Sequence, residues 1–215
     1  MNYFKYLITN LILVLFVINA TANPFEGVIF FQKTEGDNTT FFKYYVKGDH
    51  IRIEDVNEGG NLNGILLIDM KTVSLKMLSC SSQLYIEVPL SPPTDKPKVK
   101  VEKTGEIKVI QGEDCELWKV VDAQEFSHYE YWVNEGNYSF FTPMLRILNR
   151  KDKIALAWVS LEINDNYFPF EGTEYSSTGK VITRLQIIEI KEKVLDPELF
   201  NIPSNYSLFE RSINN

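Results

Sequence analysis

Short segments rich in β-branched and aromatic residues recur through most of the chain and are separated by turn residues. Within them apolar and polar positions tend to alternate, which is the period of a half-buried β-strand. The second segment is the clearest, because Phe42, Tyr44 and Val46 would share one face while Lys43 and Lys47 share the other. The pattern therefore predicts antiparallel strands joined by tight turns.

About eleven strands are expected from twelve strand-like segments, at residues 25–34, 40–47, 51–54, 65–68, 73–78, 84–88, 98–102, 107–110, 115–121, 127–133, 154–163 and 181–192. Thr104-Gly105 is interpreted as a turn between two of them. Ser91 to Lys98 reads SPPTDKPK, with three prolines and no hydrophobic residue, so we expect a loop there.

Two segments break the strand pattern. Thr142 is a capping residue type, Pro143 suits the first helical turn, and apolar residues follow, so we expect a short helix at residues 143–150. Asp196-Pro197 begins a second segment, through Phe200, in which we expect one helical turn.

Many strands with hairpin-length connections and little helix predict a mainly β fold with a minor α component. The expected form is a strongly curved antiparallel sheet, a half-barrel with one or two short helices. Residues up to the proline loop would alone make an open sheet with exposed edges, so we expect residues 23–215 to form a single domain. The chain has no internal repeat, which disfavours a propeller or a solenoid.

The N-terminal segment has the pattern of a secretory signal peptide. Lys5 is its only charge, an apolar run extends from Leu7 to Ile18, and Ala20-Thr21-Ala22 provides small residues before a cleavage point. A membrane anchor is the alternative, but the apolar run is well short of the roughly 20 residues that span a bilayer. We expect residues 1–22 to be removed near Ala22-Asn23 and the protein to be exported, to the periplasm or outside the cell.

Export changes the expectation for the two cysteines, Cys80 and Cys115. In an oxidising compartment such a pair is usually bonded, so we expect a structural disulfide. Two free thiols are the alternative. A catalytic thiol is disfavoured, because the chain has no C-x-x-C motif and neither cysteine has an adjacent basic residue.

Charge and motifs exclude several classes of function. Asp and Glu number 29 against 22 for Lys and Arg, a net charge of −7, which disfavours binding to nucleic acid. The chain has no G-x-S-x-G and no H-E-x-x-H motif, so we expect no enzyme and no cofactor. His50 and His128 are expected at surface or hairpin positions. The acidic residues lack a D-x-D-x-D-G calcium loop, so we expect no metal at Asp55, Glu58, Asp69 or Glu113-Asp114.

An ordered set of motifs runs along the chain: Phe25-Glu26-Gly27, Tyr45 to Ile53, Ile68 to Lys71, Tyr85 to Pro89, Gly112 to Trp118, Tyr131-Trp132-Val133, and Leu199 to Pro203 followed by Tyr206. Together they resemble a family of uncharacterised exported bacterial proteins placed near the lipoprotein-carrier superfamily of LolA, LolB and LppX. The resemblance covers residues 25–206. It implies a strongly curved antiparallel sheet whose apolar concave face is closed by a helix or loops. In the characterised relatives this concave face holds acyl chains.

Large aromatic residues fall in the predicted strands and are candidates to line a cavity for an apolar ligand: Phe30, Phe42, Tyr44, Trp118, Tyr131, Trp132 and Trp158. They would equally well fill an ordinary core, since each buries roughly 150–250 Å². Two hypotheses follow. The first is an exported soluble binding module that holds a lipid or acyl chain on the concave face; the alternative is a non-catalytic structural or interaction protein of the cell envelope with a filled core. The protein partner in the second case is unknown.

Overall fold

The computed structural model describes residues 24–92, 95–124, 127–163 and 165–210 of the 215-residue chain. Its strands are β1 (Gly27–Glu35), β2 (Asn38–Lys47), β3 (His50–Val56), β4 (Leu62–Asp69), β5 (Ser74–Ser79), β6 (Leu84–Glu87), β7 (Val99–Ile110), β8 (Glu113–Asp122), β9 (His128–Glu135), β10 (Tyr167–Tyr175), β11 (Val181–Glu192) and β12 (Ser207–Leu208). The helical elements are α1 (Phe141–Leu148), α2 (Lys153–Val159) and a 3₁₀ turn, η1 (Pro197–Phe200). The expected fold class, mainly β with minor helices, is confirmed.

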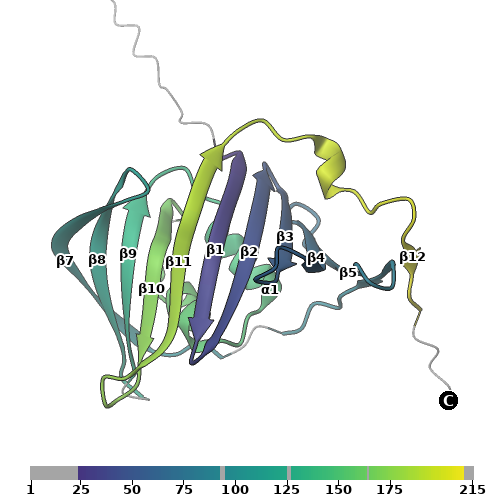
Figure 1. Ribbon diagram of the computed structural model, residues 1–215. Coiled ribbons are helices and arrows are strands. Elements are labelled where there is room, and N and C mark those ends of the chain that lie inside the picture. Colours follow the sequence, from purple (N-terminus) through teal and green to yellow (C-terminus); the bar gives the residue numbers. More distant parts are fainter. Residues whose placement is uncertain (1–23, 93–94, 125–126, 164, 211–215) are drawn as a thin grey trace, which may run out of the picture.

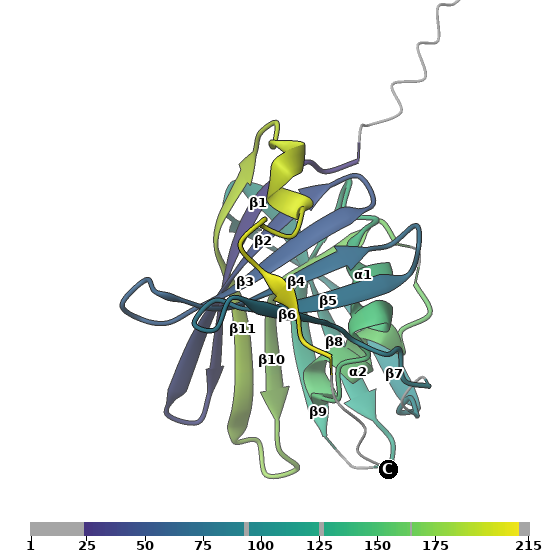
Figure 2. The same cartoon turned by 90° about the vertical axis from the view of Figure 1, so that its right-hand side faces the viewer.

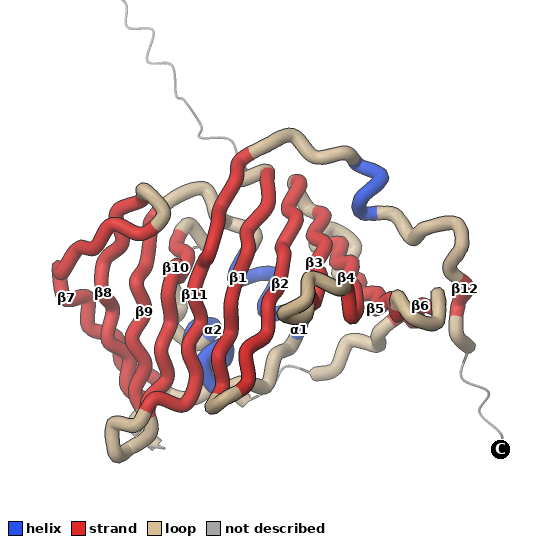
Figure 3. Tube along the Cα trace, viewed as in Figure 1, coloured by secondary structure: helices blue, strands red, loops and turns tan. Residues whose placement is uncertain are grey.

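All twelve strands belong to one sheet, in the order β12-β6-β5-β4-β3-β2-β1-β11-β10-β9-β8-β7 (Figures 1 and 3). Neighbouring strands are antiparallel, except that the short β12 runs parallel to β6. The sheet curves strongly but does not close, so that β7 and β12 are its two edges. The first strand, β1, lies in the middle of the sheet and pairs with β11 on one side and β2 on the other.

The helices α1 and α2, which we call the helix pair, cover the concave face of the sheet (Figure 2). Alternate strand residues point toward them: Ile29 and Phe31 of β1 and Tyr44 of β2 are buried, whereas Phe30 between them is half-buried. These residues join the buried faces of both helices in one large apolar core. The helix pair therefore closes the half-barrel much as a second layer would.

A smaller apolar cluster lies on the other face, the outer one. Ile65, Leu67 and Leu78 form it, and Ile202 and Tyr206 pack against it. The last two belong to residues 193–210, which cross the outside of the sheet after β11 and end in β12 (Figure 2). We call this segment the strap. It covers apolar surface that β4 and β5 would otherwise expose.

One of the two helices agrees with expectation and the other does not. The helix predicted at residues 143–150 is α1, but it begins two residues earlier, and Pro143 occupies its third position. The strand predicted at residues 154–163 is wrong, because this segment contains α2. Ala155, Leu156 and Ala157 are good helix formers in its centre, and this propensity outweighs the β-branched residues at its ends.

The sheet also differs from expectation in three places. Thr104-Gly105 is not a turn between two strands, because β7 runs through it with a shift of register between Lys103 and Ile107. Gly105 has a φ of 74° there, a conformation that glycine adopts readily. Two strands, β10 and β12, are not expected from the sequence at all.

The expected disulfide is absent, since Cys80 and Cys115 are free thiols in the structure. Cys80 follows β5 and Cys115 lies in β8, with seven strands of the sheet between these two. Cys115 belongs to the main core, while Cys80 packs on the outer cluster.

Two further expectations concern membranes and export. Within the described ranges, no helix is long and apolar enough to cross a membrane. The predicted signal peptide, residues 1–22, lies outside the described residues.

Candidate functional site

A cavity of about 60 Å³ lies between the helix pair and the concave face of the sheet. Four of the seven aromatic residues expected to line a ligand cavity line this one, namely Phe42, Tyr44, Tyr131 and Trp158. We call it the inner cavity. Ligand pockets usually enclose about 300–1,000 Å³, so the inner cavity holds no acyl chain while the helix pair stays in place.

Trp118 also lies in the core but does not line the inner cavity. It is fully buried, stacks on Trp158 with ring centroids 6.2 Å apart, and meets Tyr167 edge-on. Its Nε1 donates a 2.9 Å hydrogen bond to a carboxylate oxygen of Glu116. Lys103 lies over its ring at 4.2 Å from the centroid. Trp118 thus packs against Trp158 and supports its position in the core.

Phe30 and Trp132 are on the outer face, and the expectation that they line a concave cavity is wrong. Each occupies the strand position next to an inward residue, Phe31 and Tyr131 respectively, so it points to the opposite side. The ammonium groups of two lysines lie over these outer rings, Lys43 over Phe30 and Lys108 over Trp132. Trp158 is on the inside, but α2 places it there rather than a strand.

Two buried hydrogen bonds hold α2 in place. The hydroxyl of Tyr131, in β9, donates to the carbonyl of Ile154 at 2.7 Å. The Nε1 of Trp158 donates to the hydroxyl of Thr142 in α1 at 3.2 Å. Neither helix has a side-chain hydrogen bond at its N-cap, which is Phe140 in α1 and Asp152 in α2. Short helices without such caps are held mainly by their packing.

A second hollow, of about 150 Å³, lies on the solvent side of the helix pair. We call it the outer hollow. Its lining is Lys96, Leu145, Arg146, Asn149, Arg150, Ala155, Leu156 and Val159. Leu145, Arg150 and Ala155 also line the inner cavity. These three residues therefore separate a surface hollow from an interior one.

Arg150 is the charged residue at this partition. Its Nε donates to Asp152 at 2.7 Å. Burial is the largest single effect and opposes its charge, but the Asp152 carboxylate, with smaller contributions from Tyr44 and Glu35, outweighs it, so that the pKa of Arg150 is raised. Burial likewise raises the pKa of the hydroxyls of Tyr44 and Tyr131, so that both stay neutral and remain hydrogen-bond donors. The partition thus carries a permanent positive charge beside neutral aromatic rings.

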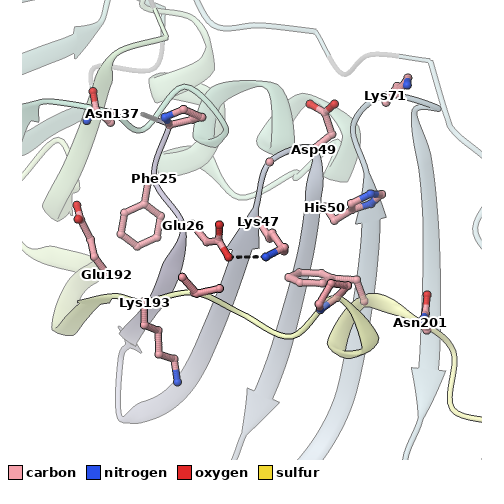
Figure 4. Close-up of a pocket in the computed structure, with 15 residues that line it drawn as sticks. Phe25, Glu26, Lys47, Asp49, His50, Lys71, Asn137, Glu192, Lys193 and Asn201 are labelled. Carbon is pink, nitrogen blue, oxygen red and sulfur yellow. Dashed lines mark hydrogen bonds and ion pairs between the residues drawn. The ribbon is translucent and has the colours of Figure 1, made fainter. Parts of the chain in front are cut away.

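A third hollow, of about 1,150 Å³, lies between the strap and one end of the sheet (Figure 4). We call it the strap hollow. It is lined by Pro24, Phe25, Glu26, Lys47, Gly48, Asp49, His50, Lys71, Asn137, Glu192, Lys193, Val194, Pro197, Phe200 and Asn201. Four of the motifs that carry the family resemblance contribute to it: those beginning at Phe25, Tyr45, Ile68 and Leu199.

Contacts across the strap hollow tie the strap to the sheet. The Nζ of Lys47 donates to Glu26 at 2.6 Å and to the carbonyl of Leu195 at 2.8 Å. The backbone N–H of Leu195 donates to the same Glu26 carboxylate at 2.8 Å. The N–H of Leu195 and the ammonium of Lys47 together lower the pKa of Glu26. The ring of Phe200 lies 6.1 Å from that of His50. We call the Glu26–Lys47–Leu195 group the latch.

The charges of the strap hollow do not select a ligand. Three carboxylates, Glu26, Asp49 and Glu192, face three lysines, with His50 beside them. Across the described part of the chain, no group of three His, Cys, Asp or Glu side chains is arranged to hold a metal ion. The hydrogen bonds of the latch explain why the side chains of Glu26 and Lys47 lie where they do. The contacts of this region therefore support a structural role.

The residues at the partition and the latch are not singled out by the sequence. Arg146, Arg150 and Ala155 matter because α1 and α2 bring them together, and the strand expected at residues 154–163 hides this arrangement. Asp152 just before a run with three helix formers is the available signal. For the latch no local signal exists, because Glu26 and Leu195 are 169 residues apart.

Fold and site together define a class: an open half-barrel whose concave face is covered by two short helices and whose outside carries a C-terminal strap. The chain belongs to the family described as domain of unknown function DUF4412, whose model matches residues 25–206. The expectation of an uncharacterised family is thereby confirmed. No curated protein sequence matches the chain.

Solved structures resemble the fold at low sequence identity. An uncharacterised conserved protein from Thermus thermophilus is 14% identical, with a TM-score of 0.51 over 86% of this chain and 91% of that chain. MucB of the Pseudomonas aeruginosa MucA/MucB complex is 9% identical, with a TM-score of 0.48 over 83% of this chain and 56% of that chain. A domain named as an outer membrane lipoprotein-sorting protein, from Vibrio parahaemolyticus, is 10% identical, with a TM-score of 0.33 over 81% and 88%.

Proposed function

We propose that this protein is an exported, non-catalytic binding module that holds a ligand with an apolar chain against the concave face of its sheet. In this proposal the helix pair is the cover of the site, and the ligand enters by displacing it. The aromatic residues that line the inner cavity, among them Tyr44, Tyr131 and Trp158, would then contact the apolar chain.

The observation that carries the proposal is the thin partition between the two hollows. Leu145, Arg150 and Ala155 line both the inner cavity and the outer hollow, so the two spaces adjoin at this layer. The helices that provide the layer are seven and eight residues long and lack side-chain N-caps. Segments of this kind open at a lower free energy than the strands around them.

The filled core favours the second candidate, a structural or interaction protein. The inner cavity is small, and Trp118, Tyr129, Tyr131, Trp158 and Phe168 are each at most 2% exposed. A filled core of this kind needs no ligand. The two candidates differ in one measurable property, whether the helix pair moves when an amphiphile is added.

Hydrogen exchange followed by mass spectrometry tests this difference. We expect dodecyl phosphate or dodecanol, each below its critical micelle concentration, to change exchange at residues 141–159 and to alter the fluorescence of Trp158. A Trp158→Phe variant identifies the part of the fluorescence change that comes from this residue. Organic extracts of the natively purified protein should also contain a co-purifying amphiphile.

A blocking variant sharpens the test. Ala155→Phe places a large ring in the partition and should reduce binding of both dodecyl probes at least about tenfold, which corresponds to about 1.4 kcal/mol. Ala155→Ser is the matched control and should bind like the natural protein. If neither probe binds and exchange at residues 141–159 is unchanged, the binding module is ruled out in favour of the filled-core protein.

A further inference from the structure

Three cationic side chains surround the outer hollow: Lys96 from the proline loop, Arg146 from α1, and Arg150 just after α1. Lys96 and Arg146 are exposed, and Arg150 is half-buried. The amide Nδ2 of Asn149 donates to the carbonyl of Pro92 at 2.9 Å, a bond that ties the loop to the end of α1. Three cations from two separate segments thus meet at one opening.

Two carboxylates form ion pairs with these cations, and Glu35 acts on Arg150 as well, but they do not neutralise all three. Asp152 pairs with Arg150 at 2.7 Å, and Asp165 lies 3.9 Å from Arg146 in an exposed contact. An exposed pair at that distance contributes little. A guanidinium also carries more N–H donors than the single Nε that Arg150 gives to Asp152. Donors for an anion therefore remain at the rim of the hollow.

The floor of the hollow has the opposite character. Leu145, Ala155, Leu156 and Val159 line it, and Leu145 and Ala155 lead on to the inner cavity. An apolar floor below a cationic rim matches a molecule with an anionic head and an apolar chain, because each part meets the surface that favours it.

We propose that the outer hollow is the head-group site for an anionic amphiphile, with Lys96, Arg146 and Arg150 binding its phosphate or carboxylate. This inference rests on the proposed function and adds the class of ligand. The apolar chain would pass the partition at Ala155 into the space that the helix pair now fills. The proline loop takes part because it supplies Lys96.

Matched dodecyl ligands test the head-group preference by titration calorimetry. We expect the natural protein to bind dodecyl phosphate at least about tenfold more tightly than dodecanol, and added salt to narrow this ratio, since two of the cations are exposed. In the double variant Lys96→Gln/Arg146→Gln, dodecyl phosphate should bind at most about twofold more tightly than dodecanol, because only the binding of dodecyl phosphate is weakened.

A control with the same loss of charge is Lys43→Gln/Arg184→Gln, two residues of the central strands β2 and β11. It should keep the full ratio. In hydrogen exchange, residues 95–98 should become protected with dodecyl phosphate but not with dodecanol, a readout that needs no variant.

Each result has a distinct meaning. If both ligands bind equally well, the binding module stands and the head-group site is overturned. If the preference survives in Lys96→Gln/Arg146→Gln, the anion binds elsewhere and the assignment to this hollow is wrong. If neither ligand binds, the proposed function itself fails.

Discussion

Glu26 joins the beginning of the sheet to the strap. Its carboxylate accepts from Lys47 and from the backbone N–H of Leu195, and the carbonyl of Leu195 in turn accepts from Lys47. Three groups from distant parts of the sequence thus satisfy one another. The strength of this arrangement depends on the charge of a single carboxylate.

Acid should therefore loosen the strap. The pKa of Glu26 in the fold lies below its ordinary value of 4.5, so its contribution is complete above that value and is lost as the pH falls through the lower folded pKa. We expect the protection of residues 193–200, measured as the exchange rate relative to the intrinsic rate at each pH, to fall over this range. In Glu26→Gln the protection should be lower at neutral pH and should change little with pH between about 5 and 3.

That test has an internal comparison. Asp69 also has a lowered pKa, mainly because the N–H of Thr72 donates to it. Asp69→Asn should leave the acid response of residues 193–200 intact, since its carboxylate serves the turn after β4. An unchanged acid response in Glu26→Gln would show that another group holds the strap.

The two thiols should react at very different rates. Burial raises the pKa of Cys115 to about 12, with the nearby Glu113 adding to the effect, so its reactive thiolate is scarce at neutral pH. We expect iodoacetamide to label Cys80 in the native protein and both residues after denaturation. Mass spectrometry of non-reduced peptides checks this. A Cys80–Cys115 peptide would contradict the structure and restore the disulfide expected from the sequence.

At the scale of the element, α2 depends on side chains outside itself. The hydroxyl of Tyr131 binds the carbonyl of Ile154 in the first turn of the helix, at a buried position. Removing it leaves that carbonyl without its buried donor, at a cost of about 1–2 kcal/mol. Tyr131→Phe should therefore lower the free energy of unfolding by that amount.

Tyr175→Phe is the matched control for that variant. It removes a hydroxyl that donates to Glu130 at a partly exposed site, where the carboxylate can bind water instead. Chemical denaturation measures both variants, and hydrogen exchange at residues 153–159 should quicken only in Tyr131→Phe. Equal effects of the two substitutions would mean that the hydroxyl of Tyr131 does not hold α2.

The sequence pattern predicts a strand well where its two faces differ in polarity, and poorly where both faces are apolar. In β2 the apolar Phe42, Tyr44 and Val46 point inward as expected. Residues 154–163 are apolar at most positions, and five of the seven residues of α2 are buried, so no period distinguishes helix from strand. The pattern misses β12 because two residues carry no period.

The site is predicted only in part for the same reason. Alternation along β9 places Tyr131 inside and Trp132 outside. The sequence-based expectation chose both as cavity-lining residues because it used only their size and aromatic character. The cations Arg146 and Arg150 could not be foreseen, because they meet Lys96 only once the proline loop folds onto α1. Contacts between distant segments leave no local trace.

At the scale of the molecule, the strap should matter for stability. Ile202 and Tyr206 cover the outer cluster of Ile65, Leu67 and Leu78. The double variant Ile202→Ser/Tyr206→Ser should lower the free energy of unfolding by about 2–4 kcal/mol, from the apolar area returned to water. It should also speed the labelling of Cys80, which packs on the same cluster.

Phe209→Ser controls for the strap variant, because Phe209 is 53% exposed and should change stability little. Denaturation curves and the Cys80 labelling rate give the two readouts. If the double variant is as stable as the natural protein, the strap is an appendage to the sheet and not a part of the fold.

The position of β1 in the middle of the sheet affects when the sheet can fold. Its partner β11 begins about 150 residues further along the chain, so the centre of the sheet cannot assemble until nearly the whole polypeptide is available. Pairings of such long sequence separation form slowly. Under the export that we propose, a chain that crosses a membrane N-terminus first would therefore complete the centre of its sheet only after β11 had emerged on the far side.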